Sequence, residues 1–245
     1  MNLPIWHSLN WKCHPNVKSG FTFKNDQYPQ SFNLAKHAFV DDDTIKLQEV
    51  QSNRLVLVEH LGLPQPIIWL TQTHSNRCVK AGLGQIDQEA DASYSDNNQQ
   101  VCVVLTADCL PIFLADVSGK EVAMVHGGWR GLLNGVIENT LAQFDSNNIQ
   151  AYLGPAIGVH AFEVGIEVKE QFVLRDKGFE SAFKSAPHPG KTMANIYQIA
   201  RVILEKKAVM DIQGGQYCTV SDSNLFSYRQ ADITGRMAHM IWLVK

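Results

Sequence analysis

The sequence predicts an α+β fold in which mixed β-sheets pack together and helices flank them. Strand-like segments follow one another through the middle of the chain, and segments with helical periodicity lie mostly before and after them. This order favours α+β over a doubly wound parallel sheet, in which strands and helices alternate. No internal repeat or linker divides the chain, so residues 1–245 are expected to form a single domain.

Five segments in the middle of the chain are typical of strands, because each is short, β-branched or aromatic, and bounded by turn residues. They are residues 67–73, 100–105, 111–116, 121–125 and 149–153. Residues 117–120 are expected to close a hairpin between the third and fourth of these strands. The C-terminal segment, residues 237–245, is also strand-like.

Helical periodicity predicts three helices. They cover residues 132–144, 168–175 and 196–207. The third carries an apolar stripe along one face, which is typical of a helix packed on a core. The stripe consists of Ile196, Ile199, Ala200, Ile203 and Leu204. Residues 184–191, KSAPHPGK, are expected to form an exposed loop because of their prolines and glycine.

Composition excludes several classes of partner. The net charge is -3 and no basic block occurs, so nucleic acid is not an expected partner. No signal peptide or membrane-length apolar run is present, so we expect a cytoplasmic protein without a membrane partner. The 5 cysteines form no CxxC pair, which argues against a disulfide framework. Neither GxGxxG nor GxxxxGK[ST] occurs, and no pattern indicates an oligomeric state.

Three potential metal ligands share one local context. His74, Cys109 and His126 each follow a predicted strand. Strand ends that enter loops can present polar side chains at one rim, and two imidazoles with a thiolate suit Zn²⁺. Three protein ligands would leave a fourth position for water or substrate. Their separations match no standard zinc motif, so on spacing alone a structural role for each residue stays open.

A family resemblance changes this balance. Seven segments resemble successive motifs of the YfiH family, also called the laccase-domain or polyphenol-oxidase family. They are TQTHSNRC (71–78), ADASYS (90–95), VLTADCLPIF (104–113), VAMVHGGWRGL (122–132), YLGPAIGVHAFEVG (152–165), FSYR (226–229) and TGRMA (234–238). The match runs from about Asn33 to the C-terminus. It implies a YfiH-like fold, and it places His74, Cys109 and His126 on the family's metal-ligand positions.

Further polar residues match recurring family positions and are candidate substrate contacts. They are Asn33, Gln72, Asp91, Asp108, Arg130, Tyr228 and Arg229, and Arg130 joins the metal trio as a catalytic candidate. Each has a structural alternative. Asp108 could instead brace the Cys109 loop, Asp91 could fix a turn with Ser93, and Arg130 could pair with a carboxylate.

The sequence departs from the family pattern at three places. NVKSGFTFKNDQYP stands where a Thr-Arg-x-Gly-Gly stretch is expected, Asn195 replaces an aspartate, and Gln230 replaces the second arginine of FSYRR. These departures leave the metal positions unchanged and concern the substrate contacts.

The resemblance implies purine nucleoside chemistry, with a purine nucleoside and phosphate as small-molecule partners. The reactions are phosphorolysis of adenosine, inosine, guanosine or methylthioadenosine, and deamination of adenosine to inosine. Zinc would lower the pKa of a water that attacks purine C6, while the metal and Arg130 or Arg229 would orient phosphate toward the anomeric carbon.

Three alternatives remain. The family name implies copper-dependent phenol oxidation, but the chain has only 9 histidines and no His-x-His pair, and one copper cannot supply the electrons that reduce O₂ to water. Zinc is therefore expected, with copper as the second possibility. The second alternative is a cysteine hydrolase with Cys109 as nucleophile and His126 or His74 as base, since the family has been linked to editing of peptidoglycan precursors. The third is a non-catalytic metal-binding or nucleotide-binding protein.

Overall fold

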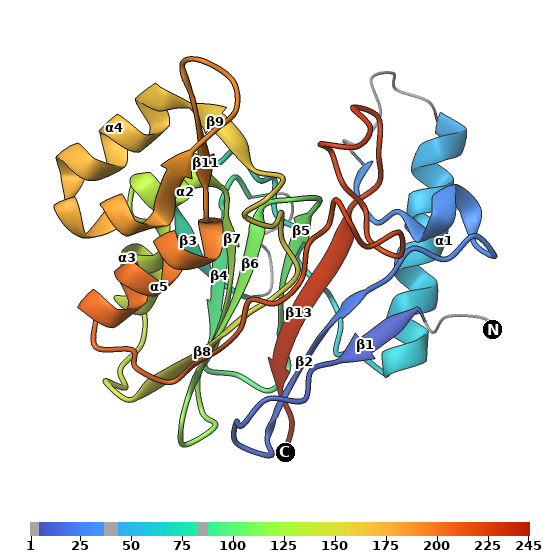
Figure 1. Cartoon of the computed structure of the whole chain (residues 1–245). Helices are drawn as coiled ribbons and strands as arrows, with labels where there is room; N and C mark the ends of the chain where they lie inside the picture. Colours follow the sequence, from blue (N-terminus) through green and yellow to red (C-terminus); the bar gives the residue numbers. More distant parts are fainter. Residues whose placement is uncertain (1–4, 37–43, 83–87) are drawn as a thin grey trace.

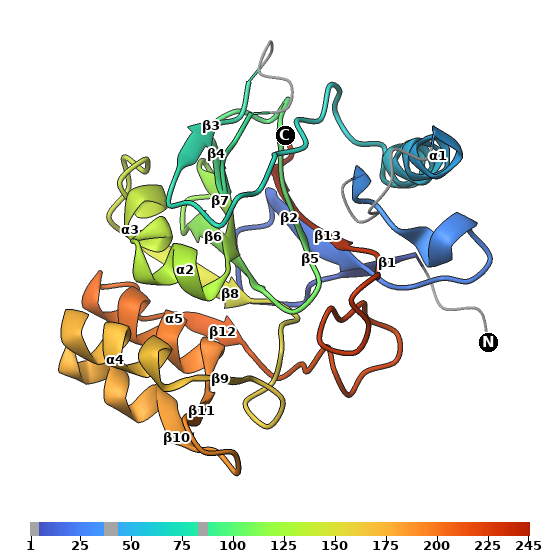
Figure 2. The same ribbon diagram turned by 90° about the horizontal axis from the view of Figure 1, so that it is seen from above.

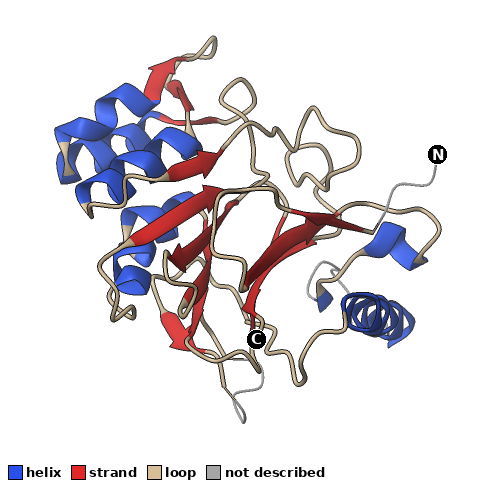
Figure 3. Cartoon of the chain, turned by 90° about the horizontal axis from the view of Figure 1, so that it is seen from below, coloured by secondary structure: helices blue, strands red, loops and turns tan. Residues whose placement is uncertain are grey.

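Two β-sheets face each other in the middle of the molecule, and helices cover the outer face of each (Figures 1 and 3). The computed structural model describes residues 5–36, 44–82 and 88–245. The predicted α+β class, with mixed sheets packed together and flanking helices, is confirmed. No helix in the described part of the chain is both long enough and apolar enough to cross a bilayer.

The larger sheet has six strands in the order β12-β8-β6-β7-β4-β3. Its strands are β3 (Cys78–Lys80), β4 (Ala92–Ser95), β6 (Leu110–Asp116), β7 (Val122–Gly127), β8 (Ile149–Leu153) and β12 (Ile212–Gly214). The outer pairs β12–β8 and β3–β4 are parallel, and the other pairs are antiparallel. The predicted hairpin joins β6 to β7, where the Asp116 carboxylate accepts the backbone N–H groups of Ser118, Lys120 and Glu121.

The second sheet is antiparallel, with the order β1-β2-β13-β5. Its strands are β1 (Trp6–Ser8), β2 (Val17–Thr22), β5 (Val101–Thr106) and β13 (Met237–Leu243). The C-terminal strand β13 lies between β2 and β5, so segments far apart in the sequence meet in this sheet (Figure 1). A third, smaller sheet contains β9 (Glu163–Gly165), β10 (Phe183–Ser185) and β11 (Lys191–Ala194). The predicted exposed loop lies at the β10–β11 hairpin.

The two large sheets pack through fully buried side chains of alternating strand residues. Cys102 of β5 and Ile241 of β13 face Phe113 of β6 and Met124 of β7. The neighbouring strand residues point the other way, so the outer face of each sheet is also buried beneath helices. Burial on both faces explains why these strands read as continuous apolar runs instead of alternating patterns.

Helices cover the sheets on opposite sides. α1 (Thr44–Leu61) lies on the four-stranded sheet, and α2 (Trp129–Leu133), α3 (Val136–Leu141) and α5 (Ile196–Lys206) lie on the six-stranded sheet beside α4 (Ile166–Arg175) (Figure 2). The predicted apolar stripe of α5 is buried, which confirms that prediction. The described residues also form two short 3-10 helices, η1 (Pro29–Phe32) and η3 (Lys177–Ala182).

Two predicted elements are wrong in extent. Residues 132–144 form no single helix, because Gly135 has a φ of +93° and separates α2 from α3. Residues 67–73 form no regular strand, and in this segment only Thr71 makes a bridge, to Glu89. The side-chain amide of Gln72 donates to the Leu105 carbonyl and accepts the Leu105 N–H, so it occupies backbone groups that a neighbouring strand would use.

The strand β2 and the helix α1 were not predicted. The inner face of α1 mixes the apolar Val50 and Leu57 with the buried polar residues Asn53 and Arg54. Asn53 donates to the carbonyls of Pro29 and Asn33, and Arg54 to the carbonyl of Leu34. A polar inner face hides the helical period that a sequence pattern relies on.

We expect Phe113→Ala to lower the free energy of unfolding by about 3–5 kcal/mol, because it leaves a cavity between the two sheets. Phe113 is fully buried and touches the rings of Tyr152 and His239. Urea denaturation measures the effect. Leu55→Ala, on the exposed face of α1, is the control and should change stability by less than about 0.5 kcal/mol. Equal urea midpoints of unfolding for Phe113→Ala and Leu55→Ala would contradict the packing of Phe113 between the two sheets.

Candidate metal centre and substrate cavity

His74, Cys109 and His126 come together from three separate segments. One possible ligand atom from each lies within 4.8 Å of the other two. Cys109 Sγ is 3.6 Å from His74 Nε2, and the two imidazole centroids are 4.9 Å apart. In the six-stranded sheet His126 pairs with Pro111, and this register places His126 beside the Cys109 turn. The sequence therefore identified the three residues that form the one cluster of this kind among the described residues.

The three residues reach the centre in different ways. Cys109 lies in the turn between β5 and β6, as expected, but His126 lies within β7 and His74 follows no regular strand. His74 has a φ of +60°, a left-handed conformation that few non-glycine residues adopt. Gly128 makes room for it, because a Cβ there would lie 2.5 Å from His74 Cδ2 and 3.3 Å from Cys109 Sγ.

The fully buried carboxylate of Asp91 holds this arrangement. Its Oδ1 lies 2.7 Å from His126 Nδ1 and accepts the His74 N–H at 3.0 Å. Its Oδ2 accepts the Ser75 N–H and hydroxyl, each at 2.6 Å, and the Thr73 N–H at 3.2 Å. Asp91 therefore braces the candidate ligands and does not line the cavity over them, and the turn that it fixes is at Ser75 instead of Ser93.

This bracing leaves the other ring nitrogen of His126 available. With Nδ1 donating to Asp91, Nε2 of a neutral imidazole carries the lone pair that a metal needs. A carboxylate behind a ligating histidine is a common feature of zinc sites, where it orients the ring and raises its basicity. The donor set of two imidazoles and one thiolate thus fits a zinc-type metal.

The charges of the centre are strongly coupled. Burial raises the pKa of the Cys109 thiol, but the charge of His126 and hydrogen bonds from both histidines outweigh it and lower that pKa to about 6. Burial lowers the pKa of His126, but Cys109 and Asp91 outweigh it and raise that pKa to about 9. These opposite shifts favour a thiolate beside an imidazolium in the metal-free centre, and a metal would replace the proton on His126.

A cavity of about 430 Å³ lies over the three residues. Its polar lining includes the predicted substrate contacts Gln72, Asp108, Arg130, Tyr228 and Arg229, together with Arg236. Its apolar lining includes Leu105, Ile157 and Phe162. The loop after β8 and the loop before β13 lie side by side at this cavity, above the strands in Figure 1. The space can accept a molecule with a flat apolar part and an anionic part.

Gln72 and Asp108, two of the predicted contacts, use their polar atoms within the fold, as Arg229 also does. The side-chain amide of Gln72 is hydrogen-bonded to the backbone of Leu105, as described above. Asp108 Oδ1 accepts the hydroxyls of Thr219 and Ser227, and its Oδ2 accepts the N–H of Arg229 at 2.7 Å. Asp108 therefore braces the cavity by tying the Cys109 turn to the loop before β13, which was the structural alternative for this residue.

The arginines differ in how they are held. Arg130 is exposed at the start of α2, with its guanidinium 4.4 Å from the Trp129 ring centroid, and it has no carboxylate partner in the described part of the chain. Arg229 donates to the carbonyls of Ala161 and Glu163. The predicted alternative of an ion pair for Arg130 is thus not observed.

Arg236, Ile157 and Phe162 were not singled out from the sequence. All three lie in quoted family motifs, so the motif match was the signal that could have found them. Arg236 Nη1 donates to the carbonyls of Thr234 and Gly235.

Asn33 does not line this cavity, so its prediction as a substrate contact is not supported. It is 1% exposed, and its Oδ1 accepts the N–H groups of Ala35 at 3.0 Å and Arg236 at 2.8 Å. Asn33 therefore positions Arg236.

The departures from the family pattern also lie outside the cavity lining. Asn195 caps α5 by accepting the N–H of Gln198, a role that asparagine and aspartate share. Gln230 donates to the Val220 carbonyl. Neither Asn195 nor Gln230 lines the cavity.

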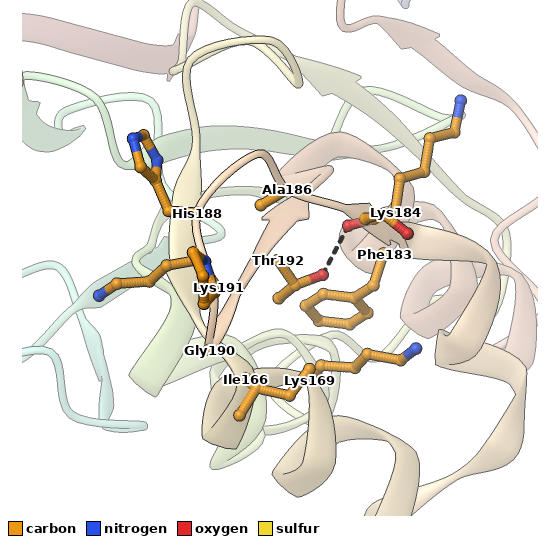
Figure 4. Close-up of a pocket in the computed structure, with 11 residues that line it drawn as sticks. Ile166, Lys169, Phe183, Lys184, Ala186, His188, Gly190, Lys191 and Thr192 are labelled. Atoms are coloured by element: carbon orange, nitrogen blue, oxygen red, sulfur yellow. Dashed lines mark hydrogen bonds between the residues drawn. The ribbon is translucent and has the colours of Figure 1, made fainter.

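A second hollow, of about 660 Å³, surrounds the β10–β11 hairpin (Figure 4). Lys169, Lys184 and Lys191 line it, but the Lys191 ammonium points to the opposite side from the other two. The Thr192 hydroxyl donates to the Lys184 carbonyl within the hairpin. The charged groups do not converge there, in contrast to those over the Cys109 turn.

Comparison with known proteins places the chain in a family. A family model described as multi-copper polyphenol oxidoreductase laccase matches residues 19–244. A purine nucleoside phosphorylase of Haemophilus influenzae is 46% identical over 241 residues, 95% of this chain and 97% of that protein. The Escherichia coli protein named purine nucleoside phosphorylase YfiH is 44% identical over 218 residues, 87% of each chain.

The fold agrees with these matches. A crystal structure of a Neisseria meningitidis protein superposes with a TM-score of 0.90 at 38% identity, and the match covers 99% of this chain and 100% of that one. The motifs, the sequence matches and the fold together show that this chain belongs to the laccase-like YfiH family.

Proposed function

We propose that this protein is a metal-dependent purine nucleoside phosphorylase. The observation that carries the proposal is one cavity in which a His-Cys-His centre, several arginines and an apolar wall lie together. The names of the relatives support the same substrate class. Adenosine, inosine, guanosine and methylthioadenosine are the proposed substrates, with phosphate as co-substrate.

Phosphorolysis makes two demands that this cavity can meet. The purine needs an apolar surface, which Ile157 and Phe162 offer, and the phosphate needs cations, which Arg130 and its neighbours offer. A phosphate oxygen bonds to the anomeric carbon as the glycosidic C–N bond breaks. The electron pair of the broken bond goes to the purine nitrogen, and the proton of hydrogen phosphate is transferred to that nitrogen. The products are ribose 1-phosphate and the free base.

We further propose that the same cavity deaminates adenosine. Water adds at purine C6 and ammonia leaves, so inosine is the product. The support is the metal centre beside the apolar wall in one cavity.

The cytoplasmic location expected from the sequence stays a prediction.

The resident metal is proposed to be zinc, with copper as the second possibility. His74, Cys109 and His126 would hold it, and when bound it supplies a Lewis acid to the cavity. One three-residue group of potential ligands occurs in the described part of the chain, which offers no support for a centre of several coppers. The ligand set therefore favours hydrolytic and transfer chemistry over laccase chemistry.

A cysteine hydrolase is the second candidate. The observation that favours it is the lowered pKa of Cys109 next to His126, which resembles an activated thiolate–imidazolium pair. A thiolate held by zinc is a poor nucleophile, whereas a free one is reactive. The state of this thiol in the native protein separates the two functions.

We expect about one equivalent of tightly held zinc per chain, because three donors converge on one point. His74→Ala and His126→Ala should empty the site, and Asp91→Ala should weaken it about 10- to 100-fold. Elemental analysis and chelator competition measure this. His188→Ala, an exposed histidine outside the centre, is the control and should keep its zinc. Full occupancy in both ligand variants would rule out the trio.

Cys109 should resist iodoacetamide while zinc is bound and react once zinc is removed. In the metal-free protein its alkylation rate should rise with pH through about 6 and then level off, because the thiolate is the reacting form. Mass spectrometry of the peptide with residues 106–111 reports it. Cys78, whose pKa burial raises to about 11, is the internal control. Rapid alkylation with zinc bound, or an acyl adduct on Cys109, would favour the hydrolase.

Adenosine should give inosine without phosphate, and added phosphate should give free base plus ribose 1-phosphate. Arg130→Ala should slow the phosphate-dependent step about 10- to 100-fold, because a contact to a charged group is worth roughly 1.5–3 kcal/mol. Chromatography of the products measures both reactions. Activity that instead needs O₂, a phenol and added copper would show that the purine assignment is wrong.

A further inference from the structure

We infer that Arg236 is the fixed anchor for the phosphate group in this cavity and that Asn33 positions it. The inference rests on the proposed phosphorolysis and assigns a residue that sequence reasoning left out. Of the three arginines that line the cavity, Arg236 combines a rigid mount with guanidinium donors that the described residues leave open.

Arg229 is less suited to this role. Its Nη1 donates to the Ala161 carbonyl at 2.8 Å and its Nη2 to the Glu163 carbonyl at 3.3 Å. Its guanidinium also lies 5.9 Å from the Phe162 ring centroid, as that of Arg236 does from the Tyr228 ring centroid, so the carbonyl contacts are what distinguish the two. These contacts tie the loop before β13 to the loop after β8, so moving this guanidinium toward a ligand would break them.

Arg130 and Arg236 remain, and they differ in burial. Arg130 is exposed, so solvent screens its charge and its side chain must be ordered when an anion binds. Arg236 is half-buried, and only its Nη1 has hydrogen-bond acceptors among the described residues, at 2.7 and 3.1 Å. Nε and Nη2 are left for another acceptor.

Arg236 has no ion-pair partner of its own: no carboxylate forms an ion pair with it in the described part of the chain. The negative charges that act on it are those of Cys109, which a bound metal would partly neutralise, and of Asp108, whose oxygens are already bonded to Ser227, Thr219 and the Arg229 backbone. Keeping a partly desolvated cation without a paired anion is costly, and a bound anion offsets that cost. The planar guanidinium fork matches two phosphate oxygens at once.

The backbone around Arg236 is held rigidly by its neighbours. Its N–H donates to Asn33 Oδ1 at 2.8 Å, and its carbonyl accepts the Leu34 N–H. On one side Gly235 packs so closely on Phe226 and Asn33 that a Cβ there would lie within 2.9 Å of both. On the other side the central strand β13 begins at Met237. A donor fixed in this way loses little freedom when it binds, so it places the phosphate accurately.

Steady-state kinetics of the zinc-loaded enzyme test the assignment. Arg236→Met should raise the KM for phosphate about 10- to 100-fold, as expected for loss of a contact to a charged group. The KM for the nucleoside should change less than about twofold, and the zinc content should stay that of the native protein. Arg236→Lys keeps a charge but loses the fork, so its phosphate KM should rise by a smaller factor. Arg77→Met removes an exposed arginine outside the cavity and serves as the control.

Asn33→Ala should shift the phosphate KM in the same direction with less effect on the nucleoside KM, which a merely structural role would not do. Thermal melts identify any variant that fails to fold, in which case the Lys and Asn33 variants decide. Direct titration with inorganic phosphate gives a readout that needs no turnover.

The outcomes separate the two proposals. Nucleoside turnover with an unchanged phosphate KM in Arg236→Met overturns the anchor and leaves the phosphorylase standing. Phosphate binding that is lost in Arg236→Met, without nucleoside turnover in the native enzyme, keeps the anion site and overturns the phosphorylase. A native enzyme that binds no phosphate by either measurement overturns the anchor.

Discussion

The arrangement of the metal centre depends on one buried carboxylate, that of Asp91. A charge without solvent contact is stable only when its oxygen lone pairs are used, and removing one partner of a buried pair costs about 3–5 kcal/mol. Asp91 meets that demand with His126 and with three successive backbone N–H groups at residues 73–75. The left-handed conformation of His74 persists because these bonds over-determine it.

The same carboxylate links structure to reactivity. It favours the proton on Nδ1 of His126, which directs Nε2 toward Cys109, and it supports the positive charge that stabilises the thiolate. That pair resembles an activated nucleophile when empty and a ligand set when a metal displaces the proton. One geometry therefore underlies both candidate functions, and the resident metal decides between them.

The cationic side of the cavity depends on contacts between distant parts of the chain. Asp108 ties the loop before β13 to the Cys109 turn through hydrogen bonds. Asn33 accepts the N–H of Arg236, which is 203 residues away in the sequence. The β13 strand fixes this loop because it is paired on both edges, with β2 and β5. A cavity with two chemically different sides thus forms where the two sheets and their loops meet.

The apolar patterns by themselves determined the strands β5 to β8 and β13 and the helices α4 and α5, because burial of whole segments leaves a strong signal. The motifs also identified His74, Cys109 and His126. The predicted extents of the segments around Gln72 and Gly135 were wrong. At Gln72 a side-chain amide takes the place of a strand partner, at Gly135 the chain has a positive φ, and neither feature changes the apolar pattern of the sequence. Only the tertiary structure decided that Asp91, Asp108 and Asn33 brace the site and that Arg236 faces it. A polar residue type fixes what a side chain can bond to, but which partner it meets depends on contacts with residues distant in the sequence.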